Sequence, residues 1–185
     1  MSPILLSHLA ALLLAITVDD VPADIAPFVE KNTTVLAVER GDLNRDGRED
    51  ALLVLEPEAA DQPRPLLILV RGADGALKLA RRSDKAVSCR ECGGVMGDPF
   101  QGVTIGKGRF TIEHYGGSSW RWTFHPTFAW SKRDQSWQLV RVESASFHAS
   151  DPESEEKTVH TPPKDFGLID VTEFDPADYL GKGKK

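Results

Sequence analysis

Between residues 33 and 147 the apolar residues occur in short runs separated by Gly, Pro, Asn and Asp. Runs of this kind, bounded by turn-forming residues, are typical of antiparallel strands joined by turns. No part of this region keeps a 3.6-residue apolar period over the length of a helix. The predicted strands include Thr33–Arg40, Asp50–Glu56, Pro65–Arg71, Ala76–Arg82, Gly102–Gly106, Arg109–Tyr115, Ser118–Phe124 and Ser136–Phe147.

Turn signals place neighbouring runs side by side. Gly72 to Gly75 predicts a turn between two strands, and Lys107-Gly108 predicts a tight hairpin. The sequence therefore predicts a mostly β domain of about seven or eight strands. We expect antiparallel meanders that form a small sandwich or a partial propeller-like stack of two sheets.

The pattern divides the chain into three parts. Residues 1–23 read as a signal peptide with an apolar helix, and residues 24–150 as the β domain. Residues 151–185 read as an acidic segment and a C-terminal tail that packs on the sheet. The stretch Ser150–Lys157 is acidic and polar, and is predicted to be mobile.

The N-terminal part decides the expected compartment. Leu9 to Val18 is an unbroken run of ten apolar residues, too short to span a bilayer but suited to a signal peptide cleaved after Ala23. The usual preceding basic residue is missing, and a buried N-terminal helix is the alternative. No Cys near the run offers a lipid attachment point. We expect a periplasmic or secreted protein with no stable membrane insertion after signal removal.

Charge narrows the classes of partner. The chain has 22 Lys and Arg against 28 Asp and Glu, which gives a formal charge of −6. No basic stripe interrupts this balance, so we expect no nucleic-acid partner and no anionic lipid partner.

Two cysteines, Cys89 and Cys92, are spaced as C-x-x-C and followed by Gly93-Gly94. In an exported chain the simplest interpretation is one disulfide across a tight loop. A zinc site would need about four ligands, and no second cysteine pair is present. A redox centre would place the motif before a helix, and no helical pattern follows. Both remain alternatives.

One loop carries a specific chemical signal. In the segment from residue 42 to residue 50, oxygen-bearing side chains occur at positions 1, 3, 5 and 9, with Gly47 at position 6; they belong to Asp42, Asn44, Asp46 and Asp50. Calcium takes six to eight oxygen ligands, and a curling loop supplies them from alternate residues. Arg48, at position 7, would offer its backbone carbonyl. The glycine permits the positive φ that such a turn requires.

This loop differs from an EF-hand, because position 12 is Leu53 where an EF-hand has a bidentate Glu. It resembles the Asp-x-Asn-x-Asp-Gly-x-x-Asp loops that precede a β-strand in FG-GAP, integrin-like propeller and VCBS proteins. The resemblance implies Ca²⁺ as a structural ion. The alternative is a polar turn in which the Asp and Asn side chains cap nearby backbone groups.

Aromatic residues gather near one predicted turn. Trp120, Trp122 and Phe124 alternate along a strand and are expected to face the core, or else to form a binding platform. Tyr115, Gly116, Gly117 and Trp120 form the best candidate for a partner-binding loop, because glycines and aromatic residues are common in recognition loops.

Enzyme motifs are weak. The segment GGSSW lacks the spacing of a nucleophile elbow, and CGGVMGDPF lacks the Lys-Ser/Thr of a phosphate loop. Glu113 and His114 are adjacent strand residues and so face opposite ways. We therefore expect a protein without catalytic residues.

From about residue 38 to residue 147, the order of motifs resembles small periplasmic β proteins of Xanthomonas-like bacteria. The motifs are the GDLNxDGxxD loop, CxxCGG with DPF, HYGGSxxRW and a late aromatic strand. The resemblance is to immunity proteins against peptidoglycan-hydrolase effectors of type IV secretion. It implies a calcium-containing, propeller-like fold and a peptidoglycan hydrolase as the protein partner. Such proteins are typically lipid-anchored or longer. The alternatives are a cell-envelope structural or carbohydrate-binding module, and a hydrolase.

Overall fold

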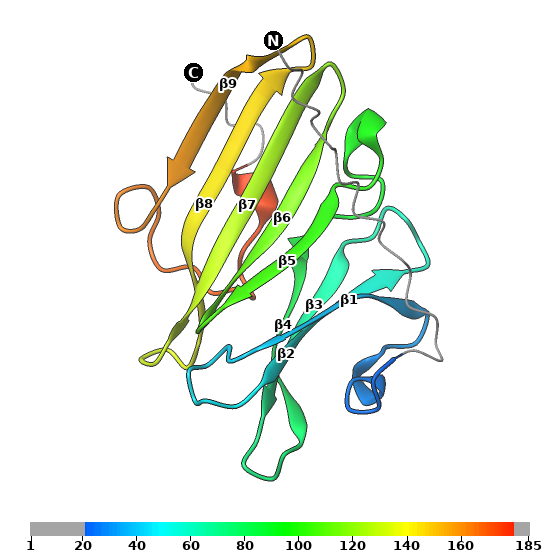
Figure 1. Cartoon of the computed structure of the whole chain (residues 1–185), viewed down its shortest axis with the longest axis vertical. Helices are drawn as coiled ribbons and strands as arrows, with labels where there is room; N and C mark the ends of the chain where they lie inside the picture. The colour runs from blue at the N-terminus through cyan, green and yellow to red at the C-terminus, as the bar shows by residue number, and fades with distance from the viewer. Residues whose placement is uncertain (1–20, 180–185) are drawn as a thin grey trace, which may run out of the picture.

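The computed structural model describes residues 21–179 and contains two antiparallel sheets (Figure 1). The first sheet has the order β1 (Thr33–Gly41), β2 (Asp50–Pro57), β3 (Arg64–Arg71) and β4 (Leu77–Val87). The second has the order β5 (Phe100–Gly106), β6 (Arg109–Gly117), β7 (Trp120–Ser131), β8 (Ser136–His148) and β9 (Asp151–His160). Three short 3-10 turns complete the described chain: η2 (Ala26–Phe28), η3 (Gly94–Met96) and η4 (Pro176–Asp178).

In both sheets the strands follow one another in chain order, so the prediction of a mostly β protein with two consecutive meanders is confirmed. No α-helix occurs between residues 21 and 179. The predicted signal helix falls within residues 1–20, which lie outside the described part of the chain. The proposed cleavage after Ala23 and the boundary at residue 150 stay predictions.

The acidic segment that was predicted to be mobile is strand β9, so that prediction is wrong. Glu143 pairs with Val159 and Ser146 with Glu156 along the β8–β9 ladder. Nearly every residue of β9 is exposed. A strand at the edge of a sheet needs only backbone partners, and its charged side chains can point into solvent on both faces. Polarity alone therefore did not exclude a strand here.

Strand β2 is buried on both faces, which explains its continuous run of apolar residues. Leu52 and Val54 face the second sheet within the main core cluster. Leu53 and Leu55 face the opposite way, toward a smaller cluster that includes Ile25. The segment before β1 therefore covers the outer face of the first sheet.

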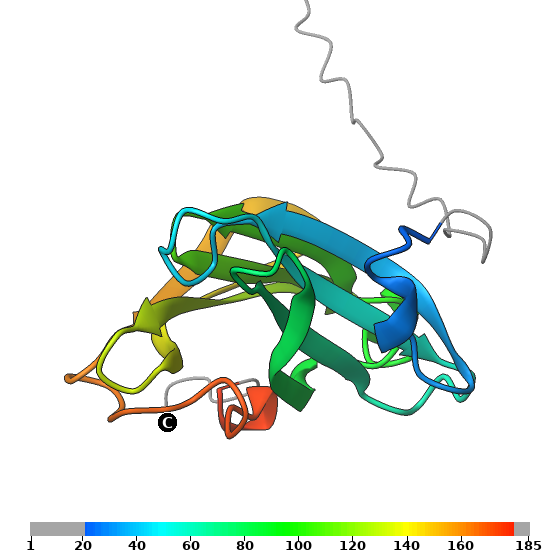
Figure 2. The same cartoon turned by 90° about the horizontal axis from the view of Figure 1, so that it is seen from below.

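The main core fills the space between the two sheets, and the segment after β9 crosses its open side (Figure 2). Phe174 in this segment lies against Phe128, with ring centroids 5.2 Å apart. Two backbone hydrogen bonds attach the same segment to β8. The Leu139 N–H donates to the Ile169 carbonyl oxygen at 2.8 Å, and the Val171 N–H donates to the Trp137 carbonyl oxygen at 2.9 Å.

A buried ion-pair cluster joins the two sheets at one end. The Arg64 guanidinium on β3 is fully buried and donates to Glu56 on β2 at 2.7 Å. It also donates to both carboxylate oxygens of Asp98, at 2.7 and 2.6 Å, in the segment that leads into β5. The carbonyl oxygen of Ser88 accepts a further bond at 3.2 Å, and the guanidinium lies over the Phe100 ring. Charge pairing and hydrogen bonding together offset the cost of burying this cation.

His114 on β6 lies beside this cluster and is fully buried. Its Nε2 accepts a hydrogen bond from the Ser88 N–H at 3.3 Å, and its Nδ1 lies 3.3 Å from the Phe124 carbonyl oxygen. These partners suit the neutral imidazole, with the proton on Nδ1. Burial lowers the pKa of His114 to about 4, because the charged form would lose its hydration.

The depressed pKa of His114 predicts acid sensitivity. Between pH 6.5 and pH 4 the unfolded chain protonates this residue and the folded chain does not, so the unfolding free energy falls as the pH falls. We expect a loss on the order of 3 kcal/mol over this window. Urea denaturation at several pH values should show a smaller pH dependence for His114→Gln, while His148→Gln, at a half-exposed site at the end of β8, should behave as wild type. Equal slopes for all three proteins would contradict the prediction.

Candidate functional site

The loop between β1 and β2 contains the predicted calcium ligands. Arg45 and Gly47 have positive φ angles of 63° and 84°, so the chain curls tightly between them. Within the curl, the side-chain oxygens of Asp42 and Asn44 both accept a hydrogen bond from the Asp46 N–H, each at 3.0 Å. The structure therefore brings the first three predicted ligands together on the inside of the loop.

Asp46 is held by Arg48 as well as by Asn44. The Arg48 N–H donates to one carboxylate oxygen at 2.9 Å, and the guanidinium of the same residue pairs with the other. Partial burial opposes ionisation, but these donors hold the pKa of Asp46 below its usual value. The Arg48 side chain also donates to the Arg71 carbonyl oxygen at 2.8 Å and so ties the loop to the end of β3.

Asp50, the first residue of β2, is fully buried. Its two carboxylate oxygens accept hydrogen bonds from the backbone N–H groups of Leu43 and Arg71, both at 2.9 Å. Burial raises the pKa of Asp50, and the nearby Asp46 carboxylate adds to the effect. No ion pair involves Asp50 in the part of the chain that the structure describes. This buried carboxylate therefore has hydrogen bonds but no cation.

The loop is also attached to the second sheet. The Leu43 carbonyl oxygen accepts a 2.8 Å hydrogen bond from the indole N–H of Trp137, and both residues are fully buried. The Asp42 carbonyl oxygen accepts a 2.8 Å bond from the Gly108 N–H in the β5–β6 turn. Ordering of this loop is consequently coupled to the packing of β8 and of the β5–β6 hairpin.

The donor set of the loop suits a hard cation. The predicted side-chain ligands, three carboxylates and one amide oxygen, lie within nine residues, and a carboxylate oxygen that accepts one hydrogen bond keeps further acceptor capacity. Across residues 21–179, however, no group of three or more His, Cys, Asp or Glu side chains is gathered closely enough to hold a metal ion. Calcium ligation by Asp42, Asn44, Asp46, Asp50 and the Arg48 carbonyl therefore stays a prediction.

The predicted disulfide between Cys89 and Cys92 is confirmed. The two Cα atoms are 5.1 Å apart, and the Cys92 N–H also donates to the Cys89 carbonyl oxygen at 3.1 Å. The bond closes a tight turn just before η3.

The predicted binding loop is the end of the β6–β7 hairpin. Trp120 was expected either in the core with Phe124 or in the binding loop. The core interpretation is wrong for Trp120, because its side chain is 62% exposed, whereas Phe124 is fully buried. Trp120 is the first residue of β7, next to the turn, and its ring packs edge-on against His148 at 5.3 Å. Alternation along a strand shows on which face of the sheet a side chain lies. It does not show whether a residue at the end of the strand is buried.

The two glycines of this hairpin allow close packing and do not form a flexible turn. A Cβ atom on Gly116 would lie 2.5 Å from the Trp122 ring, and Gly117 has a φ of 116°. The Gly117 N–H donates to the Gly93 carbonyl oxygen at 2.8 Å, and the Tyr115 N–H donates to the Pro99 carbonyl oxygen at the same distance. The hairpin end is thus fixed to the disulfide loop, with Tyr115 half-buried.

Sequence reasoning missed two residues at this place. Val95 and Met96 in η3 are 84% and 41% exposed, although both are apolar. The signal was present in the sequence, since an apolar pair flanked by glycines directly after a disulfide loop has no strand to bury it.

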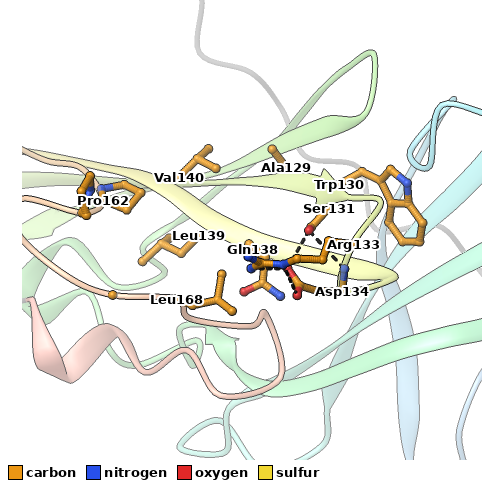
Figure 3. Close-up of a pocket in the computed structure, with 12 residues that line it drawn as sticks. Ala129, Trp130, Ser131, Arg133, Asp134, Gln138, Leu139, Val140, Pro162 and Leu168 are labelled. Atoms are coloured by element: carbon orange, nitrogen blue, oxygen red, sulfur yellow. Dashed lines mark hydrogen bonds and ion pairs between the residues drawn. The ribbon is translucent and has the colours of Figure 1, made fainter.

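A hollow of about 520 Å³ lies elsewhere, between the β7–β8 turn and the segment after β9 (Figure 3). Leu139 and Leu168 line its apolar part, and Arg133, Asp134 and Gln138 line its polar part. Arg133 and Asp134 pair with each other at 2.9 Å. No residue predicted as a site from the sequence lines this hollow.

No family model and no curated protein matches the chain. The chain is similar to a solved structure described as a Xanthomonas type IV secretion system related protein, with 13% identity and a TM-score of 0.41. The similarity covers 72% of this chain and 57% of that one. Within residues 21–179, no helix has the length and apolar character needed to cross a membrane.

The short disulfide loop predicts a modest contribution to stability. Replacing both cysteines by serine should lower the unfolding free energy by about 2 kcal/mol, because a four-residue loop restricts the unfolded chain only slightly. Urea denaturation of the double variant and of the reduced wild-type protein should give similar losses. Two free thiols in the exported protein, measured by mass spectrometry, would contradict the disulfide.

Proposed function

We propose that this chain is an exported β protein that binds a protein partner, acting as a periplasmic inhibitor or immunity protein against a peptidoglycan hydrolase. It acts by filling the cleft of the partner and has no catalytic role of its own. The observation that supports this proposal is the exposed Trp120 at the end of a hairpin whose backbone is fixed by the disulfide loop.

The hairpin end has the properties of an interface anchor. Trp and Tyr are common among residues that dominate binding energy, and a rigid backbone reduces the entropy lost on binding. Gly116 and Gly117 keep the backbone close to Trp122 and Gly93, so the aromatic side chains project from a fixed support. Tyr115 adds a half-buried ring with a hydroxyl group that can donate a hydrogen bond to a catalytic carboxylate of the partner.

Calcium has a structural role in this proposal. Asp42, Asn44, Asp46 and Asp50 would hold it, together with the backbone carbonyl of Arg48. A bound cation would screen the repulsion between the carboxylates and would offset the cost of burying Asp50. The loop would in turn keep Leu43 and Trp137 in place between the sheets.

The calcium proposal predicts a change in stability on metal removal. A site filled to about one hundred times its dissociation constant adds roughly 3 kcal/mol, so a chelator should lower the melting temperature by roughly 5–10 °C. Asp46→Ala should abolish calcium binding in calorimetry and remove the chelator effect. Asp61→Ala, an exposed acidic control in another loop, should leave both unchanged. A wild-type melting curve that does not change with chelator would show that no structural calcium is bound.

The binding proposal predicts loss of inhibition when the hairpin end is changed. Tyr115→Ala and Trp120→Ala should each abolish inhibition of a lysozyme-type muramidase by this protein, because each removes an aromatic anchor. Leu79→Ala, at a half-exposed apolar site on β4, is the matched control and should inhibit as wild type.

Melting temperatures of the three variants show whether each is folded. Inhibition that persists in both aromatic variants would exclude this hairpin as the contact. Absence of inhibition by the wild-type protein, together with its retention on purified peptidoglycan, would instead indicate a cell-envelope binding module.

A further inference from the structure

The hollow between the β7–β8 turn and the segment after β9 lies where the chain leaves the edge of β8. Strand β9 ends at His160, and the chain returns to β8 where Asp170 forms an isolated bridge with Gln138. Residues 161–168, between these points, form no ladder with β8. Val140, which lines the hollow, therefore has no ladder partner on this edge within residues 21–179. The hollow thus opens onto a stretch of uncovered strand edge.

The hollow also contains a buried acceptor that has no donor. The Gln138 side chain lines the hollow, and the residue is only 8% exposed. Its Nε2 donates to the Asp170 carboxylate at 3.1 Å, whereas its Oε1 accepts no hydrogen bond from the described residues. A buried acceptor without a donor is costly, because it has given up its hydrogen bond to water. A ligand that brings an N–H group against this amide would restore that bond.

The Gln138 amide cannot turn over to relieve its oxygen. Turning it would place Oε1 against the Asp170 carboxylate, and two acceptors that face each other repel. The other carboxylate oxygen of Asp170 accepts from the Thr172 N–H at 3.0 Å and from the Thr172 hydroxyl at 2.9 Å. Burial opposes ionisation of Asp170, but hydrogen bonds from Ser136 and Thr172 hold its pKa below the usual value. The carboxylate therefore stays charged, and Oε1 stays an acceptor.

The rest of the lining is aliphatic, with one ion pair at the rim. Figure 3 shows Gln138 between Leu168 and the pair formed by Arg133 and Asp134. Leu168 is 63% exposed, so its side chain is available to an apolar ligand group. Arg133 holds Asp134 through Nε at 2.9 Å and through Nη2 at 3.1 Å, which leaves Nη1 to donate to a ligand oxygen. The aliphatic lining residues are Ala129, Leu139, Val140, Pro162, Pro163 and Leu168.

We propose that this hollow binds a short, extended peptide segment that carries an aliphatic side chain. A peptide supplies what the lining calls for: an N–H for Gln138 Oε1, a carbonyl oxygen for Arg133, and a side chain for the aliphatic wall. An uncovered strand edge is also where extended peptides add to a sheet. The volume of about 520 Å³ lies within the range of about 300–1,000 Å³ that is typical of ligand pockets.

This site is separate from the hairpin end that is proposed as the inhibitor contact. Strand β7 runs from Trp120 to Ser131, and the hollow lies at its Ser131 end. The inference therefore goes beyond the proposed function and does not rest on it. The segment can come from a free oligopeptide or from a partner protein, since both carry the same groups.

Other occupants leave part of the hollow unmatched. A sugar needs hydrogen-bonding partners for most of its hydroxyl groups, and the lining is mainly aliphatic. An acyl chain would match the aliphatic residues but would leave the Gln138 oxygen without a donor. Water would satisfy that oxygen but would not cover the aliphatic surface.

Titration of the full-length protein with the blocked tripeptide acetyl-Ala-Leu-Ala-amide, followed by NMR, tests the site. The side-chain amide signals of Gln138 and the backbone N–H of Leu168 should shift, whereas the indole N–H of Trp120, at the other end of β7, should not. Methylation of the leucine nitrogen of the peptide removes the donor. It should weaken binding roughly tenfold, the loss of one buried hydrogen bond.

Protein variants identify the groups that the peptide meets. Gln138→Leu removes the acceptor, so methylation of the peptide should then change the affinity by less than about twofold. Leu168→Ser removes an exposed aliphatic contact and should weaken binding of both peptides by roughly fivefold. Leu79→Ser, at a half-exposed site on β4, is the matched control and should bind as wild type. Melting temperatures show whether each variant is folded, and the exposed Leu168 keeps the test valid if Gln138→Leu is not.

Two outcomes would overturn the inference. One is an effect of methylation that is equal in wild type and in Gln138→Leu. The other is the absence of shifts at the hollow at about 10 mM peptide, well above the dissociation constant of even a weak site. Neither result would change inhibition of a muramidase through the hairpin end, and loss of inhibition in Tyr115→Ala should leave peptide binding unchanged.

Competition distinguishes the two sources of the peptide. If a saturating concentration of the tripeptide leaves muramidase binding unchanged, a free oligopeptide is the ligand of the hollow. If the tripeptide displaces the muramidase, an extended segment of the partner protein occupies the same site.

Discussion

The buried guanidinium of Arg64 is the constraint on which the junction of the two sheets depends. A cation out of reach of water requires both charge partners and hydrogen-bond acceptors. One carboxylate, Glu56, comes from the neighbouring strand, and the other, Asp98, comes from the segment that leads into the second sheet. The pairing is satisfied only when that segment crosses the end of the first sheet, which positions the start of β5. Loss of either carboxylate would leave the buried Arg64 guanidinium with one carboxylate partner in place of two.

The same junction fixes the candidate binding surface. The Ser88 carbonyl oxygen accepts from Arg64, and the Ser88 N–H donates to His114, so the chain is held just before the disulfide turn. After that turn Asp98 returns to Arg64, and the intervening residues must form a compact loop. The carbonyl oxygen of Gly93 in that loop is then in place to accept from Gly117. The exposed side chains around η3 are thus supported by buried charges and are not part of a freely moving loop.

The local pattern of apolar and polar residues predicted much of the secondary structure. It failed for features that depend on contacts between residues far apart in sequence. The apolar run of β2, the disulfide and the loop from Asp42 to Asp50 follow from residues that are close in sequence, and the structure contains each of them as an element or a turn. The strand β9 was missed because its stability comes from backbone pairing with β8 and not from apolar side chains. The sequence left the exposure of Trp120 open between core and surface, because alternation does not show where a sheet ends. The role of Arg64 depends on Asp98, a residue 34 positions away, and nothing in the local sequence indicates that pair.

The proposed calcium loop and the end of the β6–β7 hairpin, where Trp120 is exposed, are related through β5 and β6. The Arg64 cluster holds the start of β5 at Phe100, whereas the Asp42 carbonyl oxygen holds the β5–β6 turn at Gly108. The loop and the end of the β6–β7 hairpin therefore act on opposite ends of the β5–β6 hairpin. Because the β6–β7 end has its own supports in the disulfide loop and in the Arg64 cluster, an ion in the calcium loop would stabilise the fold as a whole and leave the shape of this end unchanged. In the proposed arrangement calcium would govern how much folded protein is present, and the affinity of each folded molecule for a partner would depend on the exposed side chains at the hairpin end.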